Sequence, residues 1–164
     1  RQFLPLIATI VCLCIPRQGF AQDYPVIAPY VLTDTSKAMQ LTLRGGIFLL
    51  QKKYEEAKIA IEEAVEIYTR SGTENFQAAL AWQALERVHF YFGNIDEALQ
   101  AAETSGAIFK KVCPENHPKV AQSYHNLGLL YSCKQDYERS FELLNKALDL
   151  QTAQGDSCTL PLTL

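Results

Sequence analysis

The chain has few residues that could do chemistry. Its only histidines are His89, His117 and His125. Nucleophilic or general-base catalysis needs a serine, cysteine or carboxylate held within hydrogen-bond reach of such a group, and no motif places one there. His89 falls where a core aromatic residue is expected, so we expect a buried, hydrogen-bonded side chain. His117 comes before Pro118 at an expected helix start. The sequence therefore predicts no enzyme, no catalytic residue and no cofactor.

The cysteines do not form a metal-binding pattern. They are scattered over the chain without a CxxC pair or a histidine-cysteine cluster, whereas zinc sites need several soft ligands at short spacing. We therefore expect no metal site. A disulfide stays open for an exported protein, although spacing does not select its partners, and buried or free thiols are the default. The five cysteines are Cys12, Cys14, Cys113, Cys133 and Cys158.

The N-terminal residues differ in character from the rest. An apolar run from Phe3 to Pro16 lies between two arginines, and the small residues Gly19 and Ala21 follow it. This pattern predicts a signal peptide over residues 1–21 with cleavage before Gln22, and hence export to a periplasm or secretion. The run is shorter than the roughly 20 residues of a membrane-spanning helix, so we expect no membrane association after cleavage. A buried or interfacial N-terminal helix is the alternative.

Composition narrows the function classes. The 164 residues are 48% hydrophobic, which suits one domain or a few repeats. Lysine and arginine number 15 against 18 acidic residues, a net charge of −3, and no basic stripe is visible. Nucleic-acid binding needs a concentrated positive surface, so this composition argues against it.

Three segments of the chain are similar to one another. They begin at Leu41, Trp82 and Tyr124 and lie 41 and 42 residues apart. In the third, Tyr124, Leu127 and Tyr131 form an apolar helical stripe, and a second stripe follows a short break. This pattern predicts an all-α fold with helices near 36–50, 54–70, 75–91, 95–111, 118–133 and 137–152. A turn is expected at Gly93 and Asn94.

The domain plan follows from the repeats. We expect a linker over 22–35, three helical hairpins within 36–153, and the start of a truncated further repeat over 154–164. The hairpins span about 38–71, 79–112 and 121–153.

The third segment resembles the tetratricopeptide repeat, whose pattern runs W-x2-L-G-x2-Y, then A-x3-F, then A. The agreement is good at Tyr124, Leu127, Gly128, Tyr131 and Ala147, whereas Glu86 replaces the glycine in the second segment. The period is longer than the common 34 residues and is similar to kinesin-light-chain-type repeats. The resemblance implies a right-handed superhelix of antiparallel helix pairs.

The resemblance also implies a peptide-binding groove on the exposed face of each first helix. Asn126 matches the family's groove asparagine, whose amide can bond a peptide backbone, and Arg87 could pair with an acidic ligand side chain. Solvated surface residues are the alternative for both. The positions that form a carboxylate clamp in other members of the family carry no cation here, so we expect no such clamp. The groove residues carried over by phase are Gln83, Arg87, Tyr91, Gln122, His125, Asn126 and Leu129, together with Leu80, Ala84 and Cys133, and with Met39, Thr42, Leu43, Gly46 and Leu49 in the first unit.

Two functions are consistent with these observations. The first is an exported scaffold that binds a peptide or partner protein in the groove. The second is an architectural N-terminal block of a larger signalling or catalytic protein, which self-associates or docks onto its own downstream domain.

Overall fold

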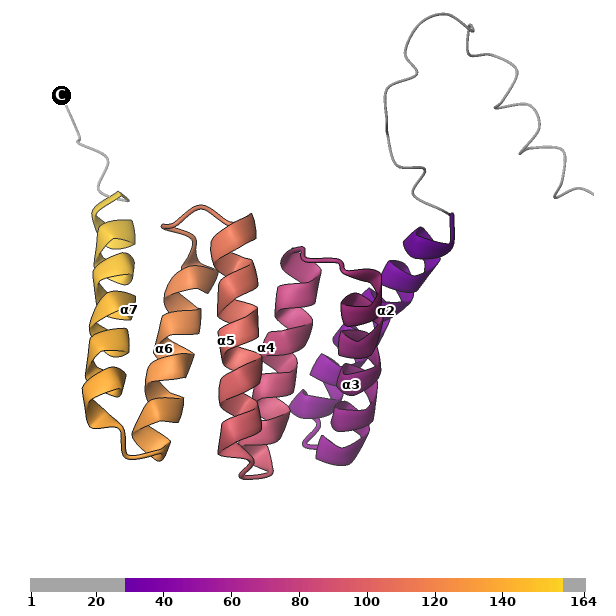
Figure 1. Ribbon diagram of the computed structural model, residues 1–164, viewed down its shortest axis with the longest axis horizontal. Coiled ribbons are helices and arrows are strands. Elements are labelled where there is room, and N and C mark those ends of the chain that lie inside the picture. Colours follow the sequence, from indigo (N-terminus) through magenta and orange to yellow (C-terminus); the bar gives the residue numbers. More distant parts are fainter. Residues whose placement is uncertain (1–28, 158–164) are drawn as a thin grey trace, which may run out of the picture.

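The computed structural model describes residues 29–157, which form six α-helices and no strand (Figure 1). This confirms the expected all-α fold, and five of the six helices begin within a residue of the expected position. The helices are α2 (Pro29–Leu50), α3 (Tyr54–Ser71), α4 (Phe76–Tyr91), α5 (Ile95–Val112), α6 (Pro118–Cys133) and α7 (Tyr137–Ser157).

Two helix ends differ from the expectation. Helix α2 begins at Pro29, so residues 29–35 of the expected linker are helical. Proline suits a first helical turn, because its missing N–H would have no intrahelical partner there. Helix α7 continues to Ser157, so residues 154–157 are helical and continuous with the third hairpin. The expected signal peptide and residues 158–164 lie outside the described part.

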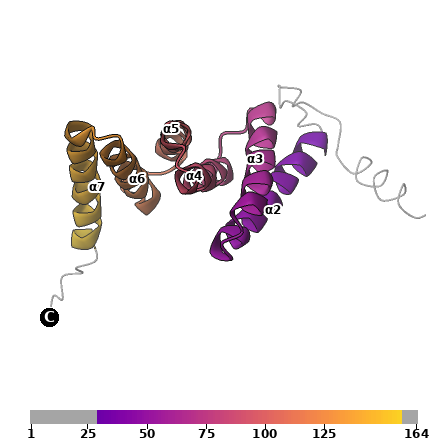
Figure 2. The ribbon, with the colours of Figure 1, turned by 90° about the horizontal axis from the view of Figure 1, so that it is seen from below.

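Consecutive helices pack as antiparallel pairs, α2 with α3, α4 with α5, and α6 with α7 (Figure 2). The pairs then stack along the long axis. Helix α4 packs closely against both α2 and α3, whereas α6 packs closely against α5 of the preceding pair and reaches α4 through side-chain hydrogen bonds. Because one hairpin cannot bury its apolar face alone, this stacking creates the core. The expected superhelix of helix pairs is confirmed.

Each pair turns at an equivalent residue. Lys52, Gly93 and Gln135 have positive φ angles of 60°, 76° and 64°. Glycine adopts this left-handed conformation without the steric cost that lysine and glutamine bear. The predicted turn at Gly93 is therefore confirmed, and the same geometry recurs where no glycine marks it.

Side chains also set where the helices begin. The Asn75 side chain accepts a hydrogen bond of 2.8 Å from the Ala78 N–H at the start of α4. Nδ1 of His117 accepts one of 3.1 Å from the Lys119 N–H, directly before Pro118 in α6. Both satisfy amides that have no intrahelical acceptor, so His117 belongs to a helix cap.

The two helices of a pair cross closely at one repeated position. A Cβ atom on Gly45 would lie 2.4 Å from Ile61 Cγ1, and one on Gly128 would lie 2.8 Å from Leu144 Cγ. Glycine on the first helix therefore accommodates a large residue on the second. In the middle pair the equivalent residues are Glu86 on the first helix and Ala102 on the second. The large residue of this pair is therefore on the first helix and the small one on the second.

We expect Gly128→Ala to destabilise the protein relative to Gly46→Ala. Both variants gain the same helix propensity, but the alanine at 128 collides with Leu144, while the space around Gly46 is open. The difference in free energy of unfolding should be about 1–3 kcal/mol, the usual cost of overpacking. Urea unfolding followed by circular dichroism measures it. Equal stability of the two variants would contradict the close crossing.

Candidate functional site

The candidate groove lies along the first helices α2, α4 and α6. Arg87 on α4 and Gln122, His125 and Leu129 on α6 are exposed, as the resemblance implied. On α2, Met39 and Leu43 are also exposed. The groove surface is thus apolar at α2 and becomes polar at α6.

Gln83 is not an exposed groove residue. Only 8% of it is accessible, and its Oε1 accepts a hydrogen bond of 3.0 Å from Lys119 Nζ. The same ammonium donates a bond of 2.9 Å to Gln122 Oε1. Burial lowers the pKa of Lys119, and the positive charge of Arg87 lowers it further. Gln83 therefore helps to bridge α4 and α6 and offers a ligand little surface.

Asn126 is half-buried and already has a protein partner. Its Nδ2 donates a hydrogen bond of 3.1 Å to Oε2 of Glu86 across the space between α6 and α4. The two sequence-based alternatives, a peptide-binding amide and a solvated surface residue, did not include this bond. Asn126 thus has fewer groups available for a peptide backbone than the resemblance implied.

Glu86 is the most perturbed acid in the described chain. It is 7% accessible, and burial raises the pKa of its carboxyl to about 7, against the opposing effects of the Asn126 hydrogen bond and the Arg87 charge. Together with Phe90, Asn126, Leu129 and Leu130, it lines a recess of about 70 Å³, which we call the α4–α6 recess. A carboxyl group thus lies in a small hollow with mainly apolar walls.

Neither Glu86 nor Lys119 is among the site residues expected from the sequence, where Glu86 is only a departure from the repeat pattern. The detectable sign was the compensating Ala102, which stands where the other pairs carry Ile61 and Leu144. Glutamate replaces the glycine of the first helix, and a small residue replaces the large one that faces it on the second helix. This paired change indicates that the glutamate side chain lies inside the helix pair.

Several of the remaining expected groove residues make contacts within the protein. Tyr91 is exposed, but its ring stacks on Tyr54 with an interplanar angle of 15°. Leu49 is buried in the core, so its assignment to the groove was wrong. Thr42 donates its hydroxyl to the Ala38 carbonyl at 2.9 Å, an ordinary intrahelical bond. Gly46 leaves open space on the groove side of α2.

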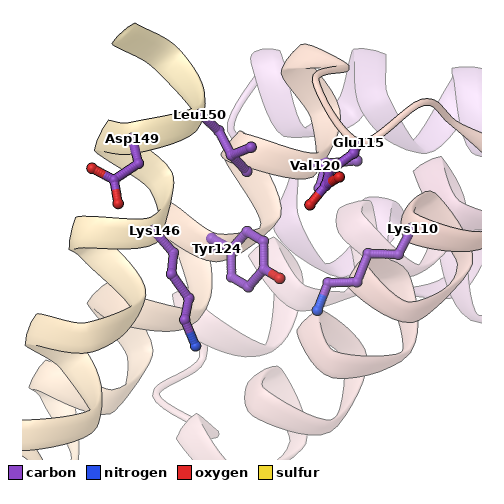
Figure 3. A pocket seen from close by; sticks show the side chains of 7 residues that line it. All are labelled: Lys110, Glu115, Val120, Tyr124, Lys146, Asp149 and Leu150. Atoms are coloured by element: carbon purple, nitrogen blue, oxygen red, sulfur yellow. The ribbon is translucent and has the colours of Figure 1, made fainter. Parts of the chain in front are cut away.

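A second, larger hollow of about 580 Å³ opens among α5, α6 and α7 (Figure 3). Lys110 and Lys146 lie on either side of Tyr124, and the Lys110 ammonium is 4.3 Å from the centroid of that ring. Glu115 and Asp149 also line the hollow, so its rim balances two cations with two anions. Its charge therefore selects neither anionic nor cationic ligands.

The other chemically active residues stay isolated. His89 is half-buried, but its Nδ1 has no hydrogen-bond partner, which differs from the expected bonded histidine. Within the described residues no group of three or more histidine, cysteine or acidic side chains could hold a metal ion. Cys113 and Cys133 are free thiols, and Cys158 lies outside that range. None of the described helices is long and apolar enough to cross a membrane.

We expect the stability gained by Glu86→Gln to depend on pH. The folded state holds the Glu86 proton up to a pKa of about 7, whereas the unfolded chain releases it near 4.5. Between these values the folded protein binds more protons, so its stability falls as pH rises. The advantage of the glutamine variant should therefore grow by about 3 kcal/mol from pH 4.5 to pH 7 and then stay constant.

Chemical denaturation across this pH range measures that difference. Glu103→Gln, which changes an exposed carboxylate on α5, should follow the pH dependence of the wild type. Parallel stability curves for Glu86→Gln and the wild type would contradict a buried, protonated carboxyl.

The repeat pattern is matched by a family model. The tetratricopeptide repeat model matches residues 38–111 and 103–153. A curated relative, Protein HGV2 of Halocynthia roretzi, is 28% identical over 108 residues. That match covers 66% of this chain but 18% of the relative, so the chain corresponds to a small part of that protein.

Solved structures share the fold. BtubC (BKLC) from P. vanneervenii matches with a TM-score of 0.65 and 21% identity, over 77% of this chain and 51% of that one. A Podosopora anserina protein with kinesin light chain TPR-like repeats matches with a TM-score of 0.63 and 22% identity. That match covers 72% of this chain and 56% of the other. The TPR domain of Arabidopsis FLU matches with a TM-score of 0.63 and 16% identity, over 73% of this chain and 98% of that domain. With its model matched across most of the described helices, the chain belongs to the tetratricopeptide repeat family.

Proposed function

We propose that this chain is a protein-interaction scaffold that binds an extended peptide or partner protein in the groove along α2, α4 and α6. The observation that carries the proposal is the exposure of Arg87, Gln122, His125 and Leu129 on facing helices of two adjacent repeats. These side chains offer a cation, an amide, an imidazole and an apolar contact. Such a mixed surface can bond a peptide backbone and distinguish its side chains. The proposed role is binding and not catalysis.

The side chains beneath this surface support the proposal. Lys119 joins Gln83 to Gln122, and Asn126 joins α6 to Glu86. These bonds hold the two first helices in register before a ligand arrives. Preorganisation of this kind lowers the cost of ordering a binding surface.

We expect Arg87→Ala, Gln122→Ala and His125→Ala in one variant to weaken peptide binding by about tenfold, or ~1.4 kcal/mol. Each substitution removes an exposed group without creating a cavity. A peptide-library screen on residues 22–164, followed by calorimetry of the enriched class, measures the effect. A control with Gln100→Ala and Arg139→Ala changes exposed residues of the second helices and should retain wild-type affinity. A library that enriches no class, with helicity confirmed, would rule out the groove.

We propose further that the chain is exported through its N-terminal segment. The apolar run and the small residues Gly19 and Ala21 support this step. Expression in cells with a secretory pathway should yield a mature protein that begins at Gln22, detectable by mass spectrometry. An Ala21→Tyr variant should remain uncleaved, because the peptidase accepts only small residues there. An unprocessed wild-type protein would contradict export.

The outer face of α7 favours an architectural role as a second candidate. On α5, a row of three residues contacts α6 and the residue that follows it. Asp96 forms an ion pair of 2.6 Å with Lys134, and Leu99 belongs to the same hydrophobic cluster as Leu130. Glu103 accepts a hydrogen bond of 3.2 Å from the Tyr131 hydroxyl. One repeat later these positions are occupied by Glu138, Phe141 and Asn145, with Leu148 and Thr152 continuing the row.

This row on α7 is exposed. Phe141 is 68% accessible and Leu148 is 56% accessible, whereas Leu99, the equivalent of Phe141, is 7% accessible. The face therefore fits another amphipathic helix that lies antiparallel to α7, as α6 lies against α5. A block that docks onto a further helix or a downstream domain would use it.

We expect Phe141→Ser with Leu148→Ser to reduce any self-association of residues 22–164, because the exposed apolar row drives it. Sedimentation equilibrium over a range of concentrations measures this. Ile59→Ser, which changes an exposed aliphatic residue of α3 away from this row, is the matched control. A protein that stays monomeric at every concentration would exclude self-docking through α7.

A further inference from the structure

We infer that the α4–α6 recess is a specificity pocket for a lysine side chain, so that the peptide bound in the groove presents a lysine opposite Glu86. This inference rests on the proposed groove function and names one feature of its ligand.

The walls of the recess fit the stem of a lysine. Phe90 and Leu129 are exposed apolar side chains at the recess, and Leu130 is buried. A lysine places its methylenes against such surfaces while its ammonium reaches a polar group. The Phe90 ring can stabilise the cation further through its π face. The volume of about 70 Å³ suits the compact end of lysine better than the broad, planar guanidinium of arginine.

The polar groups of the recess favour a cation. Glu86 contributes a carboxyl with two acceptor oxygens, and Asn126 donates to one of them. A ligand carboxylate here would meet a second carboxyl in a poorly solvated space, which is unfavourable. An ammonium group instead pairs with Glu86 and draws it into the ionised state. Arg87, the next residue on α4, is exposed. An acidic residue of the ligand could pair with Arg87 outside the recess.

The charged groups around Glu86 do not supply a ready partner. Arg87 attracts the carboxylate but is exposed, and burial still dominates the pKa. On α6, Lys119 donates to two glutamines, and on α5, Glu103 accepts from Tyr131. Other titratable groups on the surrounding helices include His89 on α4, His125 on α6, Arg44 above the Phe48 ring on α2, and Lys58 above the Phe92 ring on α3.

The test begins with the peptide class enriched by the wild-type groove. At the enriched basic position, peptides with lysine, arginine or norleucine are compared by calorimetry. We expect norleucine, which keeps the stem and lacks the charge, to bind at least tenfold more weakly than lysine, since a hydrogen bond to a charged group is lost. Arginine should bind more weakly than lysine.

The second arm uses the protein. Glu86→Gln keeps the size of the side chain and should remove the preference for lysine over norleucine, while Glu103→Gln should keep it. With a pKa of about 7 for Glu86, affinity for the lysine peptide should rise about tenfold from pH 6 to pH 8 in the wild type. The glutamine variant should lose this rise, which separates Glu86 from His89 and His125.

The outcomes are distinguishable. Enrichment of peptides without a basic position, or a lysine preference that survives in Glu86→Gln, overturns the lysine pocket and leaves the groove function standing. A library that enriches nothing refutes the groove and the pocket together.

Discussion

The close crossing of the two helices within each pair is the constraint on which the rest of the structure depends. Packed interiors conserve volume, so a large side chain on one helix requires a small one opposite. Gly45 and Gly128 satisfy this for Ile61 and Leu144. In the middle pair the exchange is reversed, with Ala102 on the second helix and Glu86 on the first. Because the first helices line the proposed groove, the reversal moves the larger side chain from the second helix to the helix of the proposed binding surface.

That exchange also determines the electrostatics of the groove. A carboxyl at the crossing is too buried to stay ionised without help, so its proton affinity rises toward neutrality. Asn126 then turns inward to bond it, and Lys119 spans to Gln83. The polar side chains of α4 and α6 therefore bond one another beneath the surface. The exposed residues above them remain accessible to the proposed partner.

The helices were largely predictable, because the apolar period, Pro118 and the Gly93 turn each act within one or two helical turns. The groove was predictable only in part. Arg87, Gln122, His125 and Leu129 lie where the repeat phase places them, since helix geometry alone determines their exposure. Gln83 and Leu49 do not, because tertiary packing covers them, and the sequence period does not specify which neighbouring side chains do so. The partnership of Asn126 with Glu86 joins residues 40 apart in sequence, a tertiary contact that no local pattern encodes.

The pairs are not joined to one another equally. The first and second pack closely along two helix–helix contacts, α2 with α4 and α3 with α4, whereas the second and third pack closely only along α5 and α6. Side-chain hydrogen bonds alone connect α4 with α6. An interface made by two helix–helix contacts constrains bending more than an interface made by one. We therefore expect the angle between the second and third pairs to change more readily than the angle between the first and second. A side chain placed between α4 and α6 would then alter the curvature of the array.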